Sequence, residues 1–406
     1  MRTLPASRPA VKDRLHVLQL ISSSGYYGAE KVVLHLSREF RKDPSCRPFV
    51  GIFHNRRNPH LEMLEECRKT GIDATPFPCE GPVDFKTAKM IRRFIREKQI
   101  DILHTHGYKA DSYGRLASMG LPVGLFATCH NWLGNDYRSK LYAAVDLFIL
   151  RWFDRIAAVS EDIQERIIRN GIAPPKVSLI RNGISLEDFE NRHSRSRLRR
   201  EMGIPQDAIV VGTVGRISPE KGHRNLFLAA RDIIAHHPEV FFLVVGDGPL
   251  RRELQVEFSS PAIHFAGYRQ DAPNLYQCMD IFVLPSLTEG LPLALLEAMA
   301  ARLPVVATRV GEIPSLVGPE NGCLVEPGNS EDLREALLYS IRNYPASAAM
   351  GEEGYGRVKS RFSSAGMAGC YMKDYAEILR AKKTMGGRPF AGRPVFERGD
   401  RGHGIS

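Results

Sequence analysis

The chain has 406 residues, of which 43% are hydrophobic and 25% charged, and its formal net charge is +10. This length favours two domains, and the composition is that of a globular protein rather than a disordered or fibrous one. Seven cysteines without any C-x-x-C spacing disfavour a disulfide framework or a zinc site and fit a reducing cytoplasm. The positive charge is not accompanied by a finger, recognition-helix or ribonucleoprotein motif, so nucleic acid is not an expected partner.

The sequence contains no segment typical of a signal peptide or a membrane span. The start, MRTLPASRPAVKDRLHVLQLI, lacks a long apolar core, and the most apolar stretch elsewhere, 141–153, is short and interrupted by Asp146 and Arg151. The stretch 382–406 is rich in Gly, Pro and Arg and has no apolar period, which predicts a disordered basic tail. We therefore expect a cytoplasmic protein, whose basic segments either favour peripheral contact with the anionic inner membrane face or merely aid solubility.

Short apolar runs alternate with amphipathic stretches along the chain, a pattern typical of an α/β fold with parallel sheets. In the first half we predict strands at 15–21, 49–53, 100–104, 124–128 and 155–159, and helices at 29–40 and 85–98. In the second half we predict strands at 209–214, 240–246, 262–267, 280–285 and 303–308.

The interval 191–207 (NRHSRSRLRREMGIPQD) has no strand pattern and separates the two series of strands, which predicts a linker. It divides an N-terminal domain, 1–190, from a C-terminal domain, 208–356. A helical segment, 357–381, follows the second domain, and a return of this segment to the first domain is one option.

Polar and glycine residues gather just after the predicted strands. Ligands of open parallel sheets bind outside the carboxyl ends of the strands. We therefore expect two domains that face each other across one cleft lined by these positions. The positions are Gly25, Gly28, His104, His106, His130, Ser160, Gly215, Arg216, Gly246, Asp247, Glu289 and Thr308.

The segment 280–308 carries the strongest chemical signal. A predicted buried strand leads into a loop with Glu289, and a helix is expected to begin near Pro292, a residue favoured at the first helical position. Free N–H groups around 291–293 and the helix dipole would bind an anion. Glu297 lies about one and a half turns into the helix. The two carboxylates would thus hold hydroxyl groups on either side of a diphosphate, unless they are a capping acid and a solvated helix residue.

The segment 209–230 (IVVGTVGRISPEKGHRNLFLAA) contributes two cations. Arg216 follows a predicted strand and its turn glycine, and Lys221 precedes the next helix. A leaving nucleoside diphosphate gains negative charge as the glycosidic bond breaks, and a guanidinium and an ammonium nearby stabilise that charge. The alternative is that both residues are solvated loop charges.

These two segments, in this order, resemble the nucleotide-sugar-binding domain of the retaining GT-B glycosyltransferases of family 4. The resemblance covers most of 209–329, through VGRISPEKG, VVGDGPLRREL, the Glu-x7-Glu segment and NGCLVEPGN. It implies two Rossmann-like domains and transfer from a nucleotide diphosphate sugar with retention and without a metal. By the same resemblance Arg216 and Lys221 bind the diphosphate. Glu289 binds the donor sugar and Glu297 the ribose. The other implied donor contacts are Gly267, Tyr268 and Arg269 at the base, and Gly290, Leu291, Pro292 and Leu293 at the phosphate and sugar.

The segment 22–37 (SSSGYYGAEKVVLHLS) resembles the glycine loop of the same family, whose backbone closes over the donor phosphate. Tyr27-Gly28 stands where a glycine pair often precedes Ala-Glu, so Tyr27 could block the closest backbone approach. Gly25 and Gly28 are predicted donor contacts, with a plain turn and helix cap as the alternative.

Three histidines follow predicted strands. The resemblance implies that His130 contacts the transferred sugar, where it could hold a hydroxyl group or order the attacking group. His104 and His106, with Lys109 and Tyr113, are predicted to line the acceptor pocket. For all three histidines a hydrogen-bonded structural role is the alternative.

Two further patterns bear on cofactors. No D-x-D sequence occurs, so the usual carboxylate pair for Mg²⁺ or Mn²⁺ is missing, and we expect neither a metal nor a cofactor. Gly246-Asp247-Gly248 begins like a dinucleotide fingerprint, but Arg251 stands at the third glycine position, which favours a strand-end turn.

We predict a hexosyltransferase in which domain closure assembles the site. UDP is the more common donor nucleotide, and GDP is the alternative. The acceptor is expected to be a glycan or a lipid-linked sugar. The residues predicted to act in the reaction are His130, Arg216, Lys221 and Glu289. The alternatives are a nucleotide-sugar epimerase or phosphorylase on the same fold, and a non-catalytic nucleotide-sugar-binding protein.

Overall fold

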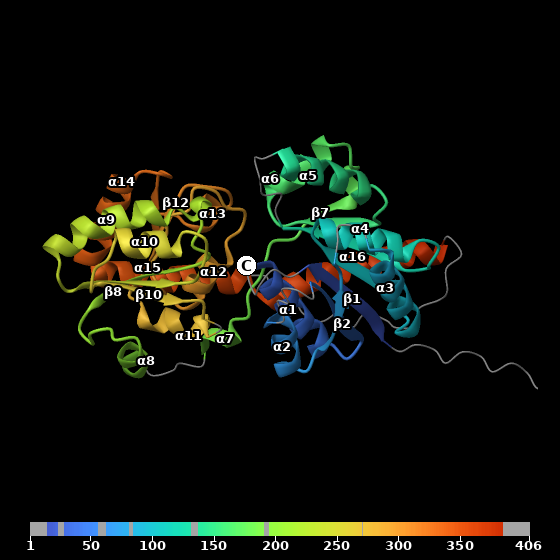
Figure 1. Ribbon diagram of the computed structural model, residues 1–406, viewed down its shortest axis with the longest axis horizontal. Coiled ribbons are helices and arrows are strands. Elements are labelled where there is room, and N and C mark those ends of the chain that lie inside the picture. Colours follow the sequence, from blue (N-terminus) through green and yellow to red (C-terminus); the bar gives the residue numbers. More distant parts are fainter. Residues whose placement is uncertain are drawn as a thin grey trace, which may run out of the picture. The chain divides into compact units, whose positions relative to one another are not determined.

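The computed structural model describes residues 14–22, 28–55, 62–80, 84–130, 137–190, 195–269 and 271–384. The chain divides into two compact units, each built on one sheet with helices on both faces (Figure 1). Unit 1 contains the described residues up to Ala158, Ile163–Ile180 and those from Ala368 onward. Unit 2 contains Val159–Asp162 and the described residues of Arg181–Met367.

The sheet of unit 1 has the strand order β3-β2-β1-β4-β5-β6-β7, and all neighbouring strands run parallel. Its strands are β1 (Leu15–Ser22), β2 (Cys46–His54), β3 (Asp73–Pro78), β4 (Ile102–His106), β5 (Gly124–Cys129), β6 (Arg155–Ala158) and β7 (Val177–Leu179). Its helices are α1 (Gly28–Lys42), α2 (Glu62–Lys69), α3 (Phe85–Glu97), α4 (Tyr108–Ser118), α5 (Tyr137–Leu150), α6 (Glu161–Arg169), the 3-10 turn η1 (Pro174–Lys176) and most of α16 (Ser364–Thr384).

The sheet of unit 2 is also parallel, with the order β10-β9-β8-β11-β12-β13. Its strands are β8 (Ile209–Val214), β9 (Val240–Val245), β10 (Ile263–Gly267), β11 (Ile281–Leu284), β12 (Val305–Thr308) and β13 (Gly322–Val325). Its helices are α7 (Glu187–Glu190), α8 (Arg195–Glu201), α9 (His223–His236), α10 (Arg251–Glu257), α11 (Ala272–Leu275), α12 (Leu293–Ala300), α13 (Ile313–Leu316), α14 (Ser330–Arg342) and α15 (Tyr344–Arg361), with the 3-10 turns η2 (Pro219–Lys221) and η3 (Tyr276–Cys278).

The central strands are apolar because helices cover both faces of each sheet. All residues of β4, β5, β9 and β11 are buried. In unit 2 the strand residues Val211, Phe242 and Val283 pack with Leu226 of α9 and Leu337 of α14 in one core cluster. Burial of each such side chain stabilises the fold by about 1.5–3 kcal/mol.

Both sheets reverse their winding at one point. In unit 1 the strand order proceeds outward from β1 in one direction and from β4 in the other, and in unit 2 the same reversal separates β8 from β11. Loops after the two strands at such a switch point diverge and leave a crevice at the carboxyl edge of the sheet. Each unit therefore offers a ligand position where the predicted polar residues lie.

The strands that the sequence pattern does not predict, β3, β7 and β13, all lie at sheet edges. The sequence of β3, DATPFP, contains two prolines, which edge positions tolerate. β7 has three residues and β13 begins with a glycine. Such edge strands are short and only partly buried, so they lack the apolar run that marks a central strand.

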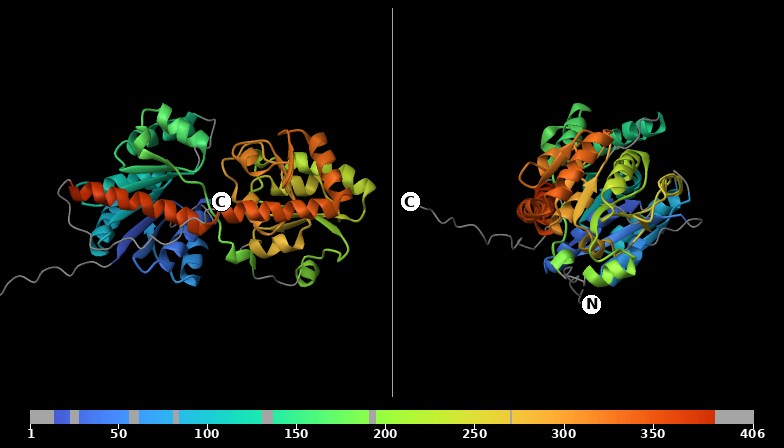
Figure 2. Two further views of the ribbon diagram at one scale, coloured as in Figure 1. Left: turned by 180° about the vertical axis from the view of Figure 1, so that it is seen from behind. Right: turned by 90° about the vertical axis from the view of Figure 1, so that its left-hand side faces the viewer.

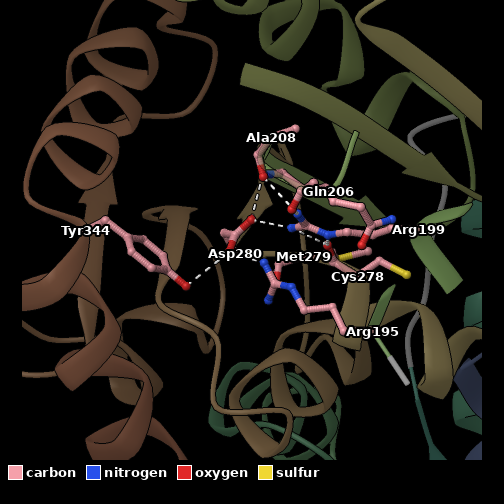
Figure 3. Close-up of polar contacts among 9 residues, drawn as sticks. Arg195, Arg199, Gln206, Ala208, Cys278, Met279, Asp280 and Tyr344 are labelled. Atoms are coloured by element: carbon pink, nitrogen blue, oxygen red, sulfur yellow. Dashed lines mark hydrogen bonds and ion pairs between the residues drawn. The ribbon is translucent and has the colours of Figure 1, made fainter. Parts of the chain in front are cut away.

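The described part of the predicted linker, 195–207, packs on unit 2 and is not a free linker (Figure 3). The guanidinium of Arg199 is 2% exposed and donates to Asp280 Oδ2 at 2.7 Å. It also donates to three carbonyl oxygens, those of Gln206, Ala208 and Cys278. Arg195 pairs with the same carboxylate, and the hydroxyl of Tyr344 donates to Asp280 Oδ1 at 3.1 Å. This buried network joins α8 to the sheet, so the boundary between the units lies earlier, near Arg181.

The predicted helical segment 357–381 is the end of α15 followed by α16. From Ala368 onward α16 belongs to unit 1, where it lies along the sheet (Figure 2), and its Tyr371 and Tyr375 contact Phe126 of β5. The predicted tail 382–406 begins too early, because α16 continues to Thr384. Residues 385–406 lie outside the described part of the chain. None of the helices in the described part combines the length and apolar character that a membrane span needs.

Candidate active site

An ion pair lies at the switch point of unit 2. Lys221, in η2 after β8, places its Nζ 2.6 Å from Oε1 of Glu289, in the loop after β11. Ser286 Oγ donates to the same oxygen at 2.7 Å. The Glu289 side chain is 8% exposed, so this carboxylate is fixed by an ammonium and a hydroxyl before any ligand binds. Lys221 and Glu289 are 68 positions apart in the sequence, and the structure brings these two predicted donor contacts together.

The loop that carries Glu289 is fixed on its other side by β12 and the turn after it. Thr308 Oγ1 donates to the carbonyl oxygen of Ser286 at 2.6 Å, and Glu312 N donates to that of Gly290 at 3.1 Å. Gly311 has a φ of +53°, and a Cβ there would overlap the carbonyl oxygen of Glu289. Only glycine allows this approach, so the position of the Glu289 backbone depends on Gly311.

Helix α12 begins at Leu293, one residue later than the sequence predicts. Pro292 has φ −75° and ψ 117°, which is extended, so it is the N-cap rather than the first helical residue. The N–H groups of Leu293 and Ala294 have no i−4 carbonyl inside the helix, and they carry the positive end of its dipole. Leu291 and Leu293 are only 6% and 7% exposed.

Glu297, also on α12, is held by a residue that the sequence does not indicate. The hydroxyl of Tyr276 in η3 donates to Glu297 Oε2 at 2.8 Å, and both side chains are buried. Burial, and then the nearby Glu297 carboxylate, raise the pKa of Tyr276 well above its usual value. Tyr276 therefore stays protonated and acts as a permanent donor, which orients the predicted ribose contact.

The ends of β8, β9 and β10 form the side of the site predicted to meet the base. Gly246 N donates to the Gly267 carbonyl oxygen at 2.8 Å, and a Cβ at Gly246 would overlap the Gly215 carbonyl, so these strand ends are in backbone contact. The motif at 246–248 is a strand-end turn in which Asp247 accepts from Gly248 N at 2.7 Å and from Arg251 at 2.8 Å.

The remaining predicted donor contacts surround these strand ends. Arg216, after β8, is exposed. Arg269 is engaged by both carboxylate oxygens of Asp271 at 2.7 Å, and Tyr268 is 38% exposed. Gly28 is the exposed first residue of α1, and Gly25 lies outside the described residues.

Unit 1 places a chain of three polar side chains at its own switch point. His106, at the end of β4, has Nε2 2.7 Å from Oε1 of Gln19 on β1 and Nδ1 3.0 Å from Nε2 of His130 after β5. With this orientation of the amide, Oε1 only accepts, so His106 donates from Nε2 and accepts at Nδ1. His130 must then donate from Nε2 and present the lone pair of Nδ1.

These two rings are neutral. Burial lowers the pKa of His130 to about 4. Burial, and then His104 and His130 beside it, lower the pKa of His106 well below its usual value. At neutral pH His130 is thus a hydrogen-bonding group without charge, whose tautomer is set by Gln19 through His106. Gln19 was not predicted from the sequence.

Two of the predicted acceptor residues, His104 and Tyr113, are buried and make internal hydrogen bonds. His104 is fully buried, and its ring nitrogens lie 2.7 Å from Thr128 Oγ1 and 2.6 Å from the hydroxyl of Tyr375. Tyr113 is 4% exposed, and its hydroxyl accepts from Asp84 N at 2.6 Å. These contacts fit the structural role that the sequence leaves open as the alternative for His104.

Lys109 is partly buried, with its ammonium 5.3 Å from the ring centroid of Phe53. Within the predicted site residues, His106 contacts both His130, through its Nδ1, and His104, whose ring centroid lies 4.1 Å from its own.

Two doubly wound parallel sheets of this kind are the GT-B architecture. The fold is that of Anabaena HepE in its complex with UDP and glucose, with a TM-score of 0.79 and 22% identity over 90% of this chain and 100% of that chain. It is also that of sucrose-phosphate synthase from Thermosynechococcus elongatus, with a TM-score of 0.74 and 19% identity over 91% of this chain and 100% of that chain.

Two family models match: Glycosyltransferase Family 4 over residues 26–188, and Glycosyl transferases group 1 over 208–343. The chain is 30% identical over 330 residues to the Escherichia coli UDP-Gal:alpha-D-GlcNAc-diphosphoundecaprenol alpha-1,3-galactosyltransferase, covering 77% of this chain and 84% of that protein. It is 27% identical to D-inositol 3-phosphate glycosyltransferase of Saccharomonospora viridis, covering 94% and 93%. The chain therefore belongs to glycosyltransferase family 4. It is a hexosyltransferase that uses a nucleotide sugar, and the epimerase, phosphorylase and non-catalytic alternatives are not favoured.

Proposed function

We propose that this enzyme transfers a hexose from a UDP-sugar to a lipid-linked sugar acceptor, with retention of anomeric configuration and without a metal. The observation that carries the proposal is the Lys221–Glu289 pair at the switch point of unit 2, beside the start of α12. The names of relatives support the donor and acceptor classes, since the E. coli relative uses UDP-Gal and a diphosphoundecaprenol-linked sugar. All seven cysteines are free thiols, which suits the cytoplasmic location proposed for the reaction.

The donor diphosphate would lie between cations and backbone N–H groups. The Lys221 ammonium and the first-turn N–H groups of α12 supply positive potential from two directions, and Arg216 adds a guanidinium from the end of β8. These groups are in place before the reaction, so they stabilise the charge that develops on the leaving UDP without reorganising.

The two carboxylates would position the donor by its hydroxyl groups. Glu289 Oε1 is occupied by Lys221 and Ser286, which leaves its second oxygen to accept from a hydroxyl of the transferred sugar. Glu297 Oε2 accepts from Tyr276, which orients the carboxylate that would accept from a ribose hydroxyl.

In the transfer step, the acceptor hydroxyl attacks the anomeric carbon from the face that UDP leaves. The bond from that carbon to the diphosphate oxygen breaks as the new glycosidic bond forms, and the proton of the acceptor hydroxyl passes to the departing phosphate oxygen. No protein base is required. The lone pair on Nδ1 of neutral His130 would accept from a sugar hydroxyl and so orient the transferred hexose.

Metal independence is part of the proposal because the chain has no D-x-D sequence. In addition, no three His, Cys, Asp or Glu side chains in the described ranges are grouped so that they could hold a metal ion. The cations of Lys221 and Arg216 would do the work that a divalent ion does in metal-dependent enzymes.

The test is a donor panel followed by product analysis. UDP-hexoses and GDP-hexoses are screened for thermal stabilisation of the protein. The stabilising donor is then incubated with prenyl diphosphate-linked sugars, with and without EDTA, and the product is analysed by mass spectrometry and NMR. We expect a UDP-sugar to stabilise, an α-linked product from an α-linked donor, and no effect of EDTA.

The variant that tests the site is Lys221→Ala, for which we expect a loss of about 10²-fold in kcat or more. Lys359→Ala, an exposed lysine of α15, is the control and should keep full activity. Stabilisation by GDP-sugars alone, an inverted product, loss of activity with EDTA, or full activity of Lys221→Ala would each contradict the corresponding part of the proposal.

A further inference from the structure

Exposed apolar side chains gather on one part of unit 1. Seven of the thirteen large hydrophobic residues found exposed in the described part of the chain lie on α4, on α5 or within two residues after them. We call these seven the aromatic face: Tyr108, Leu116, Met119, Tyr142, Val145, Phe148 and Trp152.

The aromatic face is continuous across the two helices. The rings of Tyr108 and Tyr142 stack with centroids 5.2 Å apart, which joins α4 to α5. Phe148 and Trp152 meet edge to face at 4.6 Å. On α5 the positions 142, 145 and 148 repeat with helical spacing and point outward, while Asp146 and Leu150 on the opposite side are buried. The helix is therefore apolar on the side where solvent would favour polar residues.

In the described part of α4, α5 and the turn after α5, the charged side chains that are not buried are positive, whereas the neighbouring α6 also carries exposed Glu161, Asp162 and Glu165. In the described residues 108–130 and 137–153 the acidic residues are Asp111 and Asp146, and both are buried. Arg115 lies over the Trp152 ring at 5.8 Å, and Arg151 lies over the Phe148 ring at 5.9 Å. A groove of about 380 Å³ between α5 and α6 is lined by Phe148, Arg151 and Arg166, among others. Guanidinium groups are thus interleaved with the aromatic rings.

We propose that the aromatic face docks on a bilayer surface that contains anionic lipids. Tyrosine and tryptophan rings favour the level of the lipid headgroups, where one part of the ring is apolar and its polar atom is hydrated. Arginines beside them bind lipid phosphates by paired hydrogen bonds. The proposal extends the proposed function, because docking at this face would bring the enzyme to a lipid-linked acceptor.

Charge disfavours two other occupants. A symmetric dimer through this face would bring the same arginines of two copies together. The chain beyond α16, residues 385–406, contains four Arg residues with one Glu and one Asp, so it is basic and would meet a basic surface. An anionic bilayer complements both the apolar and the charged parts of the face.

The test is flotation of the purified full-length protein with vesicles of phosphatidylcholine alone and of phosphatidylcholine mixed with phosphatidylglycerol. We expect binding to the mixed vesicles that weakens as salt is raised, since exposed charges are screened. Phe148→Ser with Trp152→Ser should weaken binding about tenfold or more, because both rings leave the interface. Arg115→Gln with Arg151→Gln should remove most of the preference for phosphatidylglycerol.

Val256→Ser and Tyr339→Ser are the matched controls, because they remove exposed hydrophobic side chains from α10 and α14 of unit 2. Both should float like the unchanged protein. The proposal is overturned if the protein does not float with mixed vesicles or if the Phe148/Trp152 variant floats as well as the controls. It is equally overturned if sedimentation shows a dimer that this variant dissolves, or if deletion of 385–406 is needed before the protein binds.

Failure of docking and failure of the proposed function give different results. Stabilisation by the UDP-sugar and transfer to a water-soluble acceptor analogue depend on the site residues and should be unchanged in the Phe148/Trp152 variant. If the unchanged protein floats but neither binds a UDP-sugar nor transfers one, the docking surface stands and the proposed donor is wrong.

Discussion

The hydrogen bond between Tyr276 and Glu297 allows a sharp test of the donor site. In Tyr276→Phe the ring stays in its buried position, and the hydroxyl is lost that donates to Glu297 Oε2 at 2.8 Å and makes a longer contact of 3.3 Å with the Ala294 carbonyl oxygen. A hydrogen bond to a charged group contributes about 1.5–3 kcal/mol, and 1.4 kcal/mol corresponds to a factor of ten. If the bond orients Glu297 toward the ribose, we expect donor affinity to fall by about 10- to 100-fold.

The loss should appear mainly in the donor KM, because the ribose is remote from the bond that breaks and its contact is made equally before and in the transition state. The measurement is initial rates against donor concentration, together with thermal stabilisation by UDP. Unfolding in urea gives the separate loss of stability, which we expect at about 1–3 kcal/mol because a buried acceptor loses its partner.

A matched control lies in the same unit. Tyr344 also donates to a buried carboxylate, Asp280 Oδ1 at 3.1 Å, but it lies in the network that fixes α8 (Figure 3). Tyr344→Phe should therefore lower stability without raising the donor KM. If the two variants lose stability alike and neither changes the donor KM, Tyr276 has only a structural role and the assignment of Glu297 to the ribose fails.

Three further changes test other parts of the site. Gly311→Ala should lower stability by about 1–3 kcal/mol and reduce kcat, because φ is positive and the new Cβ would displace the Glu289 loop. Gly356→Ala, where a Cβ meets open space, is the neutral control. Equal effects of the two substitutions on stability and kcat would contradict the argument. Burial first, with nearby cations, lowers the pKa of His35 to about 3. As pH falls, His35 is therefore protonated in the unfolded protein before it is protonated in the folded one, and stability should be lost from about pH 6.5 toward pH 3. At pH 5 the loss is about 2 kcal/mol. Urea titrations of His35→Leu should show that its stability depends less on pH than that of the unchanged protein. Gln19→Leu removes the acceptor that orients His106 and His130 and should lower kcat about tenfold with little change in KM. Gln19→Glu keeps an acceptor and should retain part of the kcat that the leucine variant loses. An unchanged pH profile and an unchanged kcat in the leucine variant would refute this role.

The central strands could be predicted from the sequence because burial on both faces leaves long apolar runs. VFFLVV of β9 is an example, and its predicted range differs from the observed one by a single residue. The edge strand β3 could not be predicted in this way, because its two prolines and partial exposure resemble a loop. The position of 195–207 on unit 2 was missed for another reason. Its anchor, the buried pair of Arg199 and Asp280, joins residues 81 apart, and the charges alone resemble those of a solvated linker.

The candidate site was predictable where a strand end and a motif coincide, as for Lys221 and Glu289. It was not predictable where contacts depend on packing between distant elements, as for Tyr276 with Glu297. The burial of His104 has a specific cause. His104 and His106 are two residues apart on β4 and so lie on one face of the sheet. His104 lies two residues before the strand end, and Tyr375 of α16 covers it there. The position at a strand end therefore indicates a site residue for His106, but not for His104, which lies two residues earlier.

The two switch points differ in charge, and this difference assigns the two ligands. In unit 2 the crevice holds an ammonium, an exposed guanidinium and helix N–H groups, and it is balanced by carboxylates that already have donors, which suits a diphosphate. In unit 1 burial keeps His106 and His130 neutral, so this crevice offers directional hydrogen bonds without net charge. An uncharged sugar hydroxyl gains from such groups, whereas a diphosphate placed there would be desolvated without a counter-charge. Under the proposed function, the same type of sheet would bind the leaving group in unit 2 and orient neutral hydroxyls in unit 1, because the charges at the strand ends differ.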